Sequence, residues 1–477
     1  MNTIIIAEFI LYFIVIIAIG YATSRTKMSH AVFLLGGKKL PGWALAFSER
    51  ATGESAWLLL GFTGFVFTTG LAGIWVAVGI ALGIIFSWLV LAQKFRKEAD
   101  NYQVLTLPDY LAVRFREKAN LIRWIASILI ACFFMFYLGA QLAGAGKLFL
   151  TTFDINETVG IILATVVVLA TAFFGGFLSV VWTDMVQSIM MLATLCVLPV
   201  IALIYIGTHD LSISQSLVEA GDSFDSWFGG ATGFALGVLF FNNFSWFFGY
   251  LGGQPQLSTR FMALKNDKEA KQGISVAIIW TVMAYTGAFL IGLAAIALYQ
   301  QGSFADVETI LPFMILDLLP PWIAGLLLAG ILAAIITTAN SQLMVVTSSV
   351  SEDIIHRTLG LNLTDKQLVT LSRVIVIVSG VIGMIIALTS DSLLYLVVSW
   401  AWAGIGCTLS PAILMTFFWK RYSGVGVVAT IISGFVFTVL WISTPLDEII
   451  TSRFSTFFIA AIFGIVFSLL FPDRKKV

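Results

Sequence analysis

Long apolar runs separated by short polar connections make up nearly all of this 477-residue chain. Because a helix rises about 1.5 Å per residue, about 20 apolar residues are enough to cross the hydrocarbon core of a bilayer. Thirteen runs reach that length, and they predict an all-α polytopic membrane protein. The runs cover approximately 3–22, 43–69, 72–93, 121–149, 157–174, 182–208, 229–252, 273–300, 322–348, 368–390, 393–418, 424–444 and 453–471. The stretch 304–320 is expected to be an external loop helix.

Composition and charge support this pattern and orient it. The chain is 59% hydrophobic and 11% charged, with a mean hydropathy of +0.99, whereas soluble domains carry about 25% charged residues. If the N-terminus lies outside, 23 of the 26 lysines and arginines fall on the inner side and the outer loops are acidic. Positive residues favour the cytoplasmic side of a membrane. We therefore expect thirteen spans, an external N-terminus and a cytoplasmic C-terminus.

The second apolar run is interrupted by the polar segment Ser48-Glu49-Arg50-Ala51-Thr52-Gly53-Glu54-Ser55-Ala56-Trp57. Each charged side chain at bilayer depth costs roughly 2.5 to 3.5 kcal/mol on insertion scales, so such residues persist mainly where they have a function. Gly53 and its small polar neighbours also weaken the helix. An interrupted helix leaves backbone carbonyls and amides free to bind an ion or a small solute. This segment is the first candidate for the functional centre.

A second interruption, Gly249-Tyr250-Leu251-Gly252-Gly253-Gln254-Pro255, lies near the end of the seventh run. Two broken helices five spans apart indicate inverted repeats with a midplane substrate site. Glycines that only permit close helix packing are the alternative explanation. Packing glycines do not account for the charges of the first interruption.

The ninth run carries a third polar cluster, in which Ala334, Thr337 and Thr338 share one helix face. Threonine hydroxyls in membrane helices commonly bond back to a carbonyl of the preceding turn. Two hydroxyls beside a carbonyl can instead provide three oxygens to a hard cation such as Na⁺. The residues alone leave both readings open.

The sequence motifs of several other functional classes are absent. The sequence has no GxxxxGK[ST] phosphate loop and no HExxH, and its three histidines all lie in polar connections. We therefore expect one integral domain over residues 1–477 that is not an enzyme, uses no organic cofactor and binds no nucleic acid. No obligatory protein partner is expected. A transporter-like sensor would need an output module, which is not evident.

Specific motifs follow one another along nearly the whole chain. They are Leu34-Leu35-Gly36-Gly37, Thr106-Leu107-Pro108-Asp109-Tyr110, Gly175-Gly176-Phe177-Leu178-Ser179-Val180-Val181-Trp182-Thr183-Asp184 with Gln187, Gly253-Gln254-Pro255, Arg260-Phe261-Met262-Ala263, Ile331-Leu332-Ala333-Ala334 and Trp402-Ala403-Gly404. Together they resemble the sodium/solute symporter family, most closely its bacterial sodium/proline symporter branch.

The resemblance implies a LeuT-type core of five-plus-five inverted repeats, in which the first helix of each repeat is broken. The first repeat would comprise spans 2–6, about 43–208, and the second would comprise spans 7–11, about 229–418. Three peripheral helices, at 3–22, 424–444 and 453–471, would lie outside this core.

The resemblance also implies the binding residues. Na⁺ would be held by the carbonyls of Ala51, Glu54 and Ala334 and the hydroxyls of Thr337 and Thr338. The substrate would lie beside it, against Trp57, Tyr137, Trp246, Tyr250, Gln254 and Pro255. Aromatic faces would cover a small ring or aliphatic group, while freed amides would hold a carboxylate.

The first interruption departs from the family pattern. Proline symporters usually carry an aspartate important for Na⁺ at the position of Gly53, and here the acidic residue is Glu54. Glu49 and Arg50 stand where that branch has small residues. Arg50 could pair with Glu54 on a helix or bind a substrate carboxylate, and Glu54 could introduce proton coupling. Asp184 is a further candidate for a charge pair or for coupling.

These features predict a secondary transporter of the inner membrane. It would couple inward Na⁺ flow to uptake of a small solute by alternating access, and proline or a related amino acid is the preferred substrate. The alternative is Na⁺- or H⁺-coupled symport of another small solute, such as a monocarboxylate, a pantothenate-like compound or a sugar.

Overall fold

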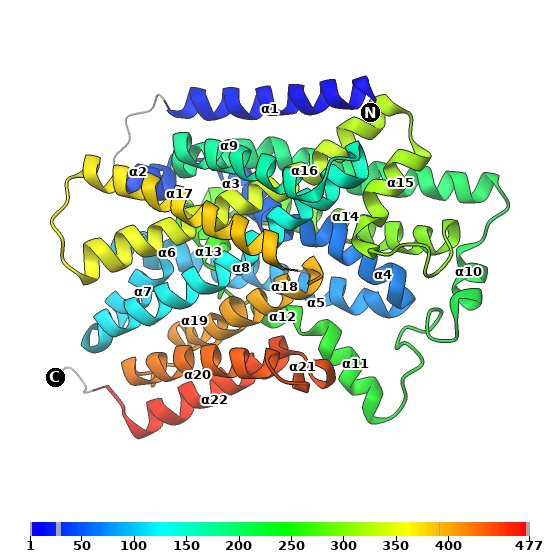
Figure 1. The fold of residues 1–477 in the computed structure, drawn as a ribbon. Coiled ribbons are helices and arrows are strands. Elements are labelled where there is room, and N and C mark those ends of the chain that lie inside the picture. The colour runs from blue at the N-terminus through cyan, green and yellow to red at the C-terminus, as the bar shows by residue number, and fades with distance from the viewer. Residues whose placement is uncertain (1, 25–29, 391, 474–477) are drawn as a thin grey trace.

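The computed structural model describes residues 2–24, 30–390 and 392–473, and within them every regular element is a helix (Figure 1). The α-helices are α1 Thr3–Ser24, α2 His30–Leu35, α3 Gly42–Ala56, α4 Thr63–Thr69, α5 Ile74–Phe86, α6 Ala92–Tyr102, α7 Leu107–Arg114, α8 Ala119–Phe153, α9 Glu157–Thr208, α10 Ile213–Ala220, α11 Phe234–Phe244, α12 Trp246–Gly249, α13 Pro255–Met262, α14 Asp267–Leu298, α15 Ile310–Leu318, α16 Pro321–Ser348, α17 Asp365–Thr389, α18 Leu394–Trp402, α19 Thr408–Phe418, α20 Gly424–Ile442, α21 Leu446–Ile449 and α22 Ser452–Leu470. Short 3₁₀ or π-helical segments occupy Gly36–Lys38, Trp57–Phe62, Gly70–Gly73, Ser87–Leu91, Arg116–Lys118, Val307–Thr309, Ser349–Thr358 and Ala403–Cys407.

Ten helices in the described part of the chain are long and apolar enough to cross a membrane, fewer than the thirteen runs in the sequence. One of them extends over 61 residues, Gly42–Tyr102, and contains two predicted runs because the connection between them is itself helical. Two other predicted runs form the shorter apolar helices Glu157–Phe173 and Phe234–Gly249. The loop stretch 304–320 contains α15, which has nine residues and is too short to span.

The first break falls at Ser55, two residues beyond the glycine that the sequence had suggested. Ser55 has φ 55° and ψ −172°, and a π-helical segment follows it. A non-glycine residue in that region costs about 1–3 kcal/mol, so the surroundings must stabilise it. Helix α8 does so: Tyr137 Oη donates to Ser55 Oγ (3.2 Å), and Gln141 Oε1 accepts from the Ala56 amide (3.0 Å). The break therefore lies within the predicted interruption, at a small polar neighbour of Gly53, while Gly53 itself remains in the helix.

The second break lies between α12 and α13, as predicted. Gly252 has φ 90°, Gln254 is extended, and Pro255 begins α13 at the first position, where a missing amide hydrogen does no harm. A Cβ on Gly253 would lie 2.1 Å from the Gly406 carbonyl oxygen, so only glycine allows this close approach. The break is therefore built by glycine and proline.

The broken α3 occupies the centre of the molecule, where it packs against α9, α14 and α16 (Figure 1). Helix α9 is itself interrupted at Gly176, which has φ 56°. Helices α20 and α22 pack together at one edge and α1 lies at the opposite edge.

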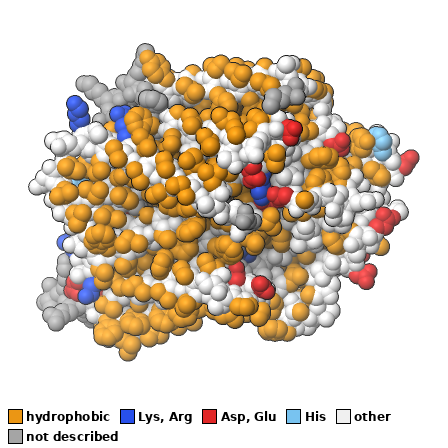
Figure 2. All heavy atoms as spheres, in the orientation of Figure 1, with side chains coloured by type: hydrophobic (Ala, Val, Ile, Leu, Met, Phe, Trp, Pro, Cys, Tyr) orange, Lys and Arg blue, Asp and Glu red, His pale blue; other side chains and the backbone are white. Residues whose placement is uncertain are grey.

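Hydrophobic side chains cover most of the visible face, while acidic side chains gather at its right-hand end and basic ones near its left-hand end (Figure 2).

Candidate functional site

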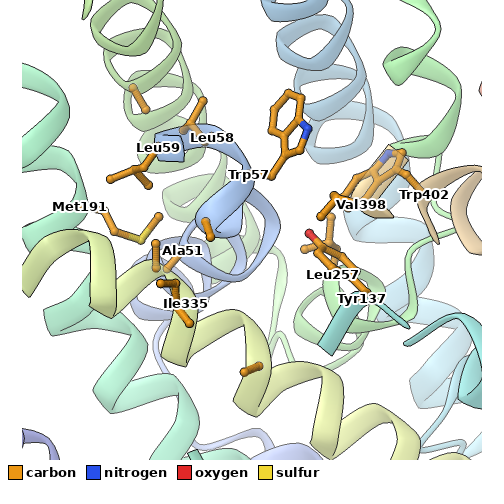
Figure 3. Packing of buried hydrophobic residues seen from close by; sticks show 14 of the residues in the cluster. Ala51, Trp57, Leu58, Leu59, Tyr137, Met191, Leu257, Ile335, Val398 and Trp402 are labelled. Carbon is orange, nitrogen blue, oxygen red and sulfur yellow. The ribbon is translucent and has the colours of Figure 1, made fainter. Parts of the chain in front are cut away.

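The predicted sodium ligands lie where the broken α3 meets α16. All five residues are fully buried. Thr338 Oγ1 donates to the Thr52 carbonyl oxygen at 3.1 Å, which joins residues 286 positions apart. Ala51 lies beside Ile335 of α16 (Figure 3). The fold thus places threonine hydroxyls against the backbone of the break, an oxygen-rich setting that suits a hard cation.

Asp184 of α9 reaches the same place. Its Oδ1 accepts a hydrogen bond from Thr337 Oγ1 at 2.5 Å, and its Oδ2 accepts one from Ser48 at 2.6 Å. Because Thr337 donates its proton to Asp184, its lone pairs remain free to face a cation.

Arg260 of α13 is a member of this site that sequence reasoning missed. It is buried, and its Nη2 lies 3.2 Å from Asp184 Oδ2 and donates to Ser341 Oγ at 2.6 Å. Its Nε donates to Ser48 Oγ at 3.1 Å. Arg260 therefore links α3, α9 and α16. The sequence contained a signal for it, a basic residue inside a family motif, but not its partners.

Arg50 is enclosed by the two neighbouring glutamates. Its Nη1 lies 2.7 Å from Glu54 Oε1, its Nε donates to Glu49 Oε2 at 2.5 Å, and its Nη2 bonds Glu49 Oε1. The Arg50–Glu54 pair is the one expected for a helical segment. Trp88 Nε1 donates to Glu49 Oε2 at 2.9 Å, and the Tyr285 hydroxyl donates to Glu54 Oε2. All four carboxylate oxygens are therefore hydrogen-bonded. Sequence reasoning missed Trp88 and Tyr285, which come from other spans.

The predicted substrate residues gather in an aromatic cluster next to the break. The ring centroids of Trp57 and Trp246 are 4.3 Å apart, those of Tyr250 and Trp402 are 4.8 Å apart, and those of Tyr137 and Trp402 are 6.3 Å apart. Figure 3 shows Trp57 with its nitrogen on the side toward Tyr137 and Trp402. All five rings are buried.

Two further residues of this neighbourhood come from α18, and sequence reasoning gave neither a role. Trp402 lay in a family motif, whereas Tyr395, 5.5 Å from the Trp57 ring, had no signal. The remaining predicted substrate residues, Gln254 and Pro255, are buried at the start of α13. Gln254 Oε1 accepts from Gln256 Nε2 at 3.1 Å.

Residues 33–434 match the family model described as the sodium:solute symporter family. The chain belongs to this family. Among relatives of this symporter, the high-affinity proline transporter PutP of Bacillus subtilis is 34% identical over 433 residues, which cover 90% of each chain. The sodium/proline symporter of Escherichia coli is 30% identical over 447 residues, which cover 92% of this chain and 88% of that one.

Among solved structures, the symporter is similar to a substrate-bound, outward-open Na⁺-coupled sialic acid symporter. The TM-score is 0.81 with full coverage of both chains, at 21% sequence identity. This likeness shows a shared fold. Family membership identifies the chain as a multi-pass membrane transporter and supports Na⁺ as its coupling ion.

Proposed function

We propose that this symporter couples Na⁺ entry to the uptake of proline or a closely related amino acid. The observation that carries the proposal is the juxtaposition at Ser55, where an oxygen-rich α3–α16 contact adjoins an aromatic cluster. Relatives named as proline transporters match 90% or more of the chain, which favours proline among small solutes.

In this mechanism Na⁺ lies between α3 and α16. The carbonyls of Ala51, Glu54 and Ala334 and the hydroxyls of Thr337 and Thr338 would hold it. The substrate lies against Trp57, Tyr137, Trp246, Tyr250, Gln254 and Pro255. Ion and substrate would share the short segment Glu54–Trp57, so binding of one would order the backbone that the other needs. The binding free energies of Na⁺ and substrate would thus be coupled without direct contact between them.

The charges of the break would then be structural. Every guanidinium nitrogen of Arg50 already bonds Glu49 or Glu54, which disfavours Arg50 as the ligand of a substrate carboxylate. Arg50 and Tyr285 both donate hydrogen bonds to Glu54, so its carboxylate is fully partnered within the break. Membership of the sodium:solute symporter family supports Na⁺ as the coupling ion. Asp184, paired with Arg260, would orient the Thr337 hydroxyl toward Na⁺.

Transport would proceed by rocking of the first two helices of each repeat against the other helices. We assign thirteen spans to a single domain over 1–477, with repeats at about 43–208 and 229–418 and an external N-terminus in the cell's inner membrane. The two helix breaks support the repeats, and the separation of acidic and basic side chains in Figure 2 supports the orientation. One Na⁺ moving down about 100 mV releases about 2.3 kcal/mol, enough for a nearly fifty-fold gradient of a neutral zwitterion.

The test is uptake of labelled proline by the purified protein in liposomes with an imposed Na⁺ gradient and membrane potential. We expect accumulation that disappears when choline replaces Na⁺ and that does not respond to a proton gradient. Competition by a panel of amino acids, monocarboxylates and sugars would establish the substrate. Proline uptake that is indifferent to Na⁺ would refute the proposal.

A further inference from the structure

Arg453, at the start of α22, is a buried cation directly behind the aromatic cluster. Its side-chain carbon Cζ lies 4.3 Å from the centroid of the Trp246 ring, and only 5% of the residue is exposed. Trp246 also contacts Trp57, and their ring centroids are 4.3 Å apart. A positive charge from a peripheral helix thus lies one aromatic ring away from the residue that adjoins the break in α3.

The guanidinium of Arg453 bonds only uncharged acceptors. Nε donates to Ser245 Oγ at 3.1 Å, Nη2 donates to the Asn242 carbonyl at 3.1 Å, and Nη1 donates to Ser399 Oγ. Within the described residues, no carboxylate lies within 4 Å of it. The neighbouring Asp447 accepts instead from Trp400 Nε1 at 2.8 Å and the Ser452 amide at 2.6 Å.

The other buried arginines among the described residues are all ion-paired. Arg50 is paired with two glutamates, Arg123 with Asp109 and Arg260 with Asp184. An unpaired buried charge is costly, so its retention suggests that a counter-charge arrives from elsewhere. In a symporter of amino acids, the substrate carboxylate is such a charge.

Buried hydrogen-bond donors in the cluster also lack acceptors. Trp57 Nε1, Trp402 Nε1 and Gln254 Nε2 are inaccessible to solvent and have no hydrogen-bond partner among the described residues. Leaving a buried donor without a partner is unfavourable, and an anionic group beside these rings would relieve it. The excess of donors and the unpaired cation therefore both favour the same chemical group.

We propose that Arg453 is a specificity-determining residue that stabilises the carboxylate of the substrate in the Trp57–Trp246–Trp402 cluster. The inference rests on the proposed function and assigns the carboxylate to the side of α22, away from Arg50. The positive charge of Arg453 would attract the carboxylate across the Trp246 ring, without direct contact between Arg453 and the substrate. It lies beyond residues 33–434, so the family model carries no information about it.

The experiment compares proline with prolinamide, which has the same ring but no carboxylate, in full-length protein reconstituted in liposomes. For Arg453→Gln we expect the KM for proline to rise about 10- to 30-fold. This is the effect of removing a unit positive charge roughly 8 Å from the substrate carboxylate at an effective dielectric constant of about 20. The inhibition constant of prolinamide should not rise, so the preference for proline falls by the same factor. The Na⁺ concentration for half-maximal uptake at saturating proline should stay unchanged.

Two variants separate charge from anchoring. Arg453→Lys keeps the charge and should retain most of the preference for proline, whereas Ser399→Ala removes one anchor of Arg453 and should leave the preference unaltered. Equal weakening of proline and prolinamide in Arg453→Gln, or loss of the preference in Arg453→Lys, would overturn the inference. If Arg453→Gln does not fold, loss of the preference for proline in Arg453→Lys would still overturn the inference. Absence of proline uptake by the wild-type protein would instead refute the proposed function.

Discussion

The two helix breaks of this symporter are made of different chemistry. The break in α3 combines a non-glycine residue in a left-handed conformation with three buried charges that bond one another. The break before α13 uses Gly252, Gly253 and Pro255 and carries aromatic rings. A polar break leaves oxygens suited to an ion, whereas an aromatic break leaves faces suited to an organic solute. The two breaks therefore present different chemical groups to the interior, although residues from both halves of the chain surround each of them.

The charges of the first break offer the largest effect. Arg50→Met leaves Glu49 and Glu54 buried without their cation, and removal of one partner from a buried pair typically costs about 3–5 kcal/mol. We expect a large drop in melting temperature and little folded protein. The triple variant Glu49→Gln, Arg50→Met, Glu54→Gln should recover much of the stability. An unchanged melting temperature of Arg50→Met would show that the ion pairs of Arg50 with Glu49 and Glu54 do not stabilise the fold.

The second break should be sensitive to volume and not to charge. Gly253→Ala places a methyl group 2.1 Å from the Gly406 carbonyl oxygen and 2.4 Å from the Ser410 nitrogen. We expect a destabilisation of about 1–3 kcal/mol with loss of proline uptake. Gly237→Ala is the matched control, because nothing lies within 4 Å of its added methyl group. Equal behaviour of the two variants would remove the argument that close packing shapes this break.

Ion and solute effects should separate between the two regions. Thr338→Val removes one hydroxyl oxygen, so we expect about a tenfold rise in the Na⁺ concentration for half-maximal uptake, about 1.4 kcal/mol. Thr338→Ser keeps the oxygen and should behave like the wild type. Uptake kinetics at varied Na⁺ measure both. A change confined to proline affinity would contradict the assignment of α16 to the ion.

The smallest effect concerns the strain at Ser55. Ser55→Ala keeps the left-handed conformation and loses the hydrogen bonds with Tyr137 and the Trp57 amide. Ser55→Gly loses the same bonds but adopts that conformation freely, so it should be about 1 kcal/mol more stable than Ser55→Ala. Thermal unfolding of the two proteins in detergent measures the difference. An alanine variant at least as stable as the glycine variant would mean that the break relaxes in solution.

Arg453, the proposed specificity determinant, shows why some interior contacts were not predictable from the sequence. In the sequence it is one of three basic residues outside the inner connections, and nothing nearby suggests a function. Its proposed role rests on the approach of α22 to Trp246, about 200 residues earlier in the chain. Tyr285 is similar, because it donates to Glu54 across 231 residues. Such contacts depend on helix packing and side-chain direction, neither of which local periodicity records.

The sequence by itself determined the membrane character, the family, the location of both breaks to within a few residues and the polar face of α16. Hydrophobic length, charge and motif spacing are local properties, so they can be read from the chain. Only the tertiary structure decided that the first helix breaks at Ser55 and that Arg50 bonds both neighbouring glutamates. It also decided that Arg260 bonds Asp184 and that Arg453 lies against Trp246. These outcomes depend on which helices meet in the interior, where burial makes each unpaired charge or hydrogen-bonding group costly and so selects its partners.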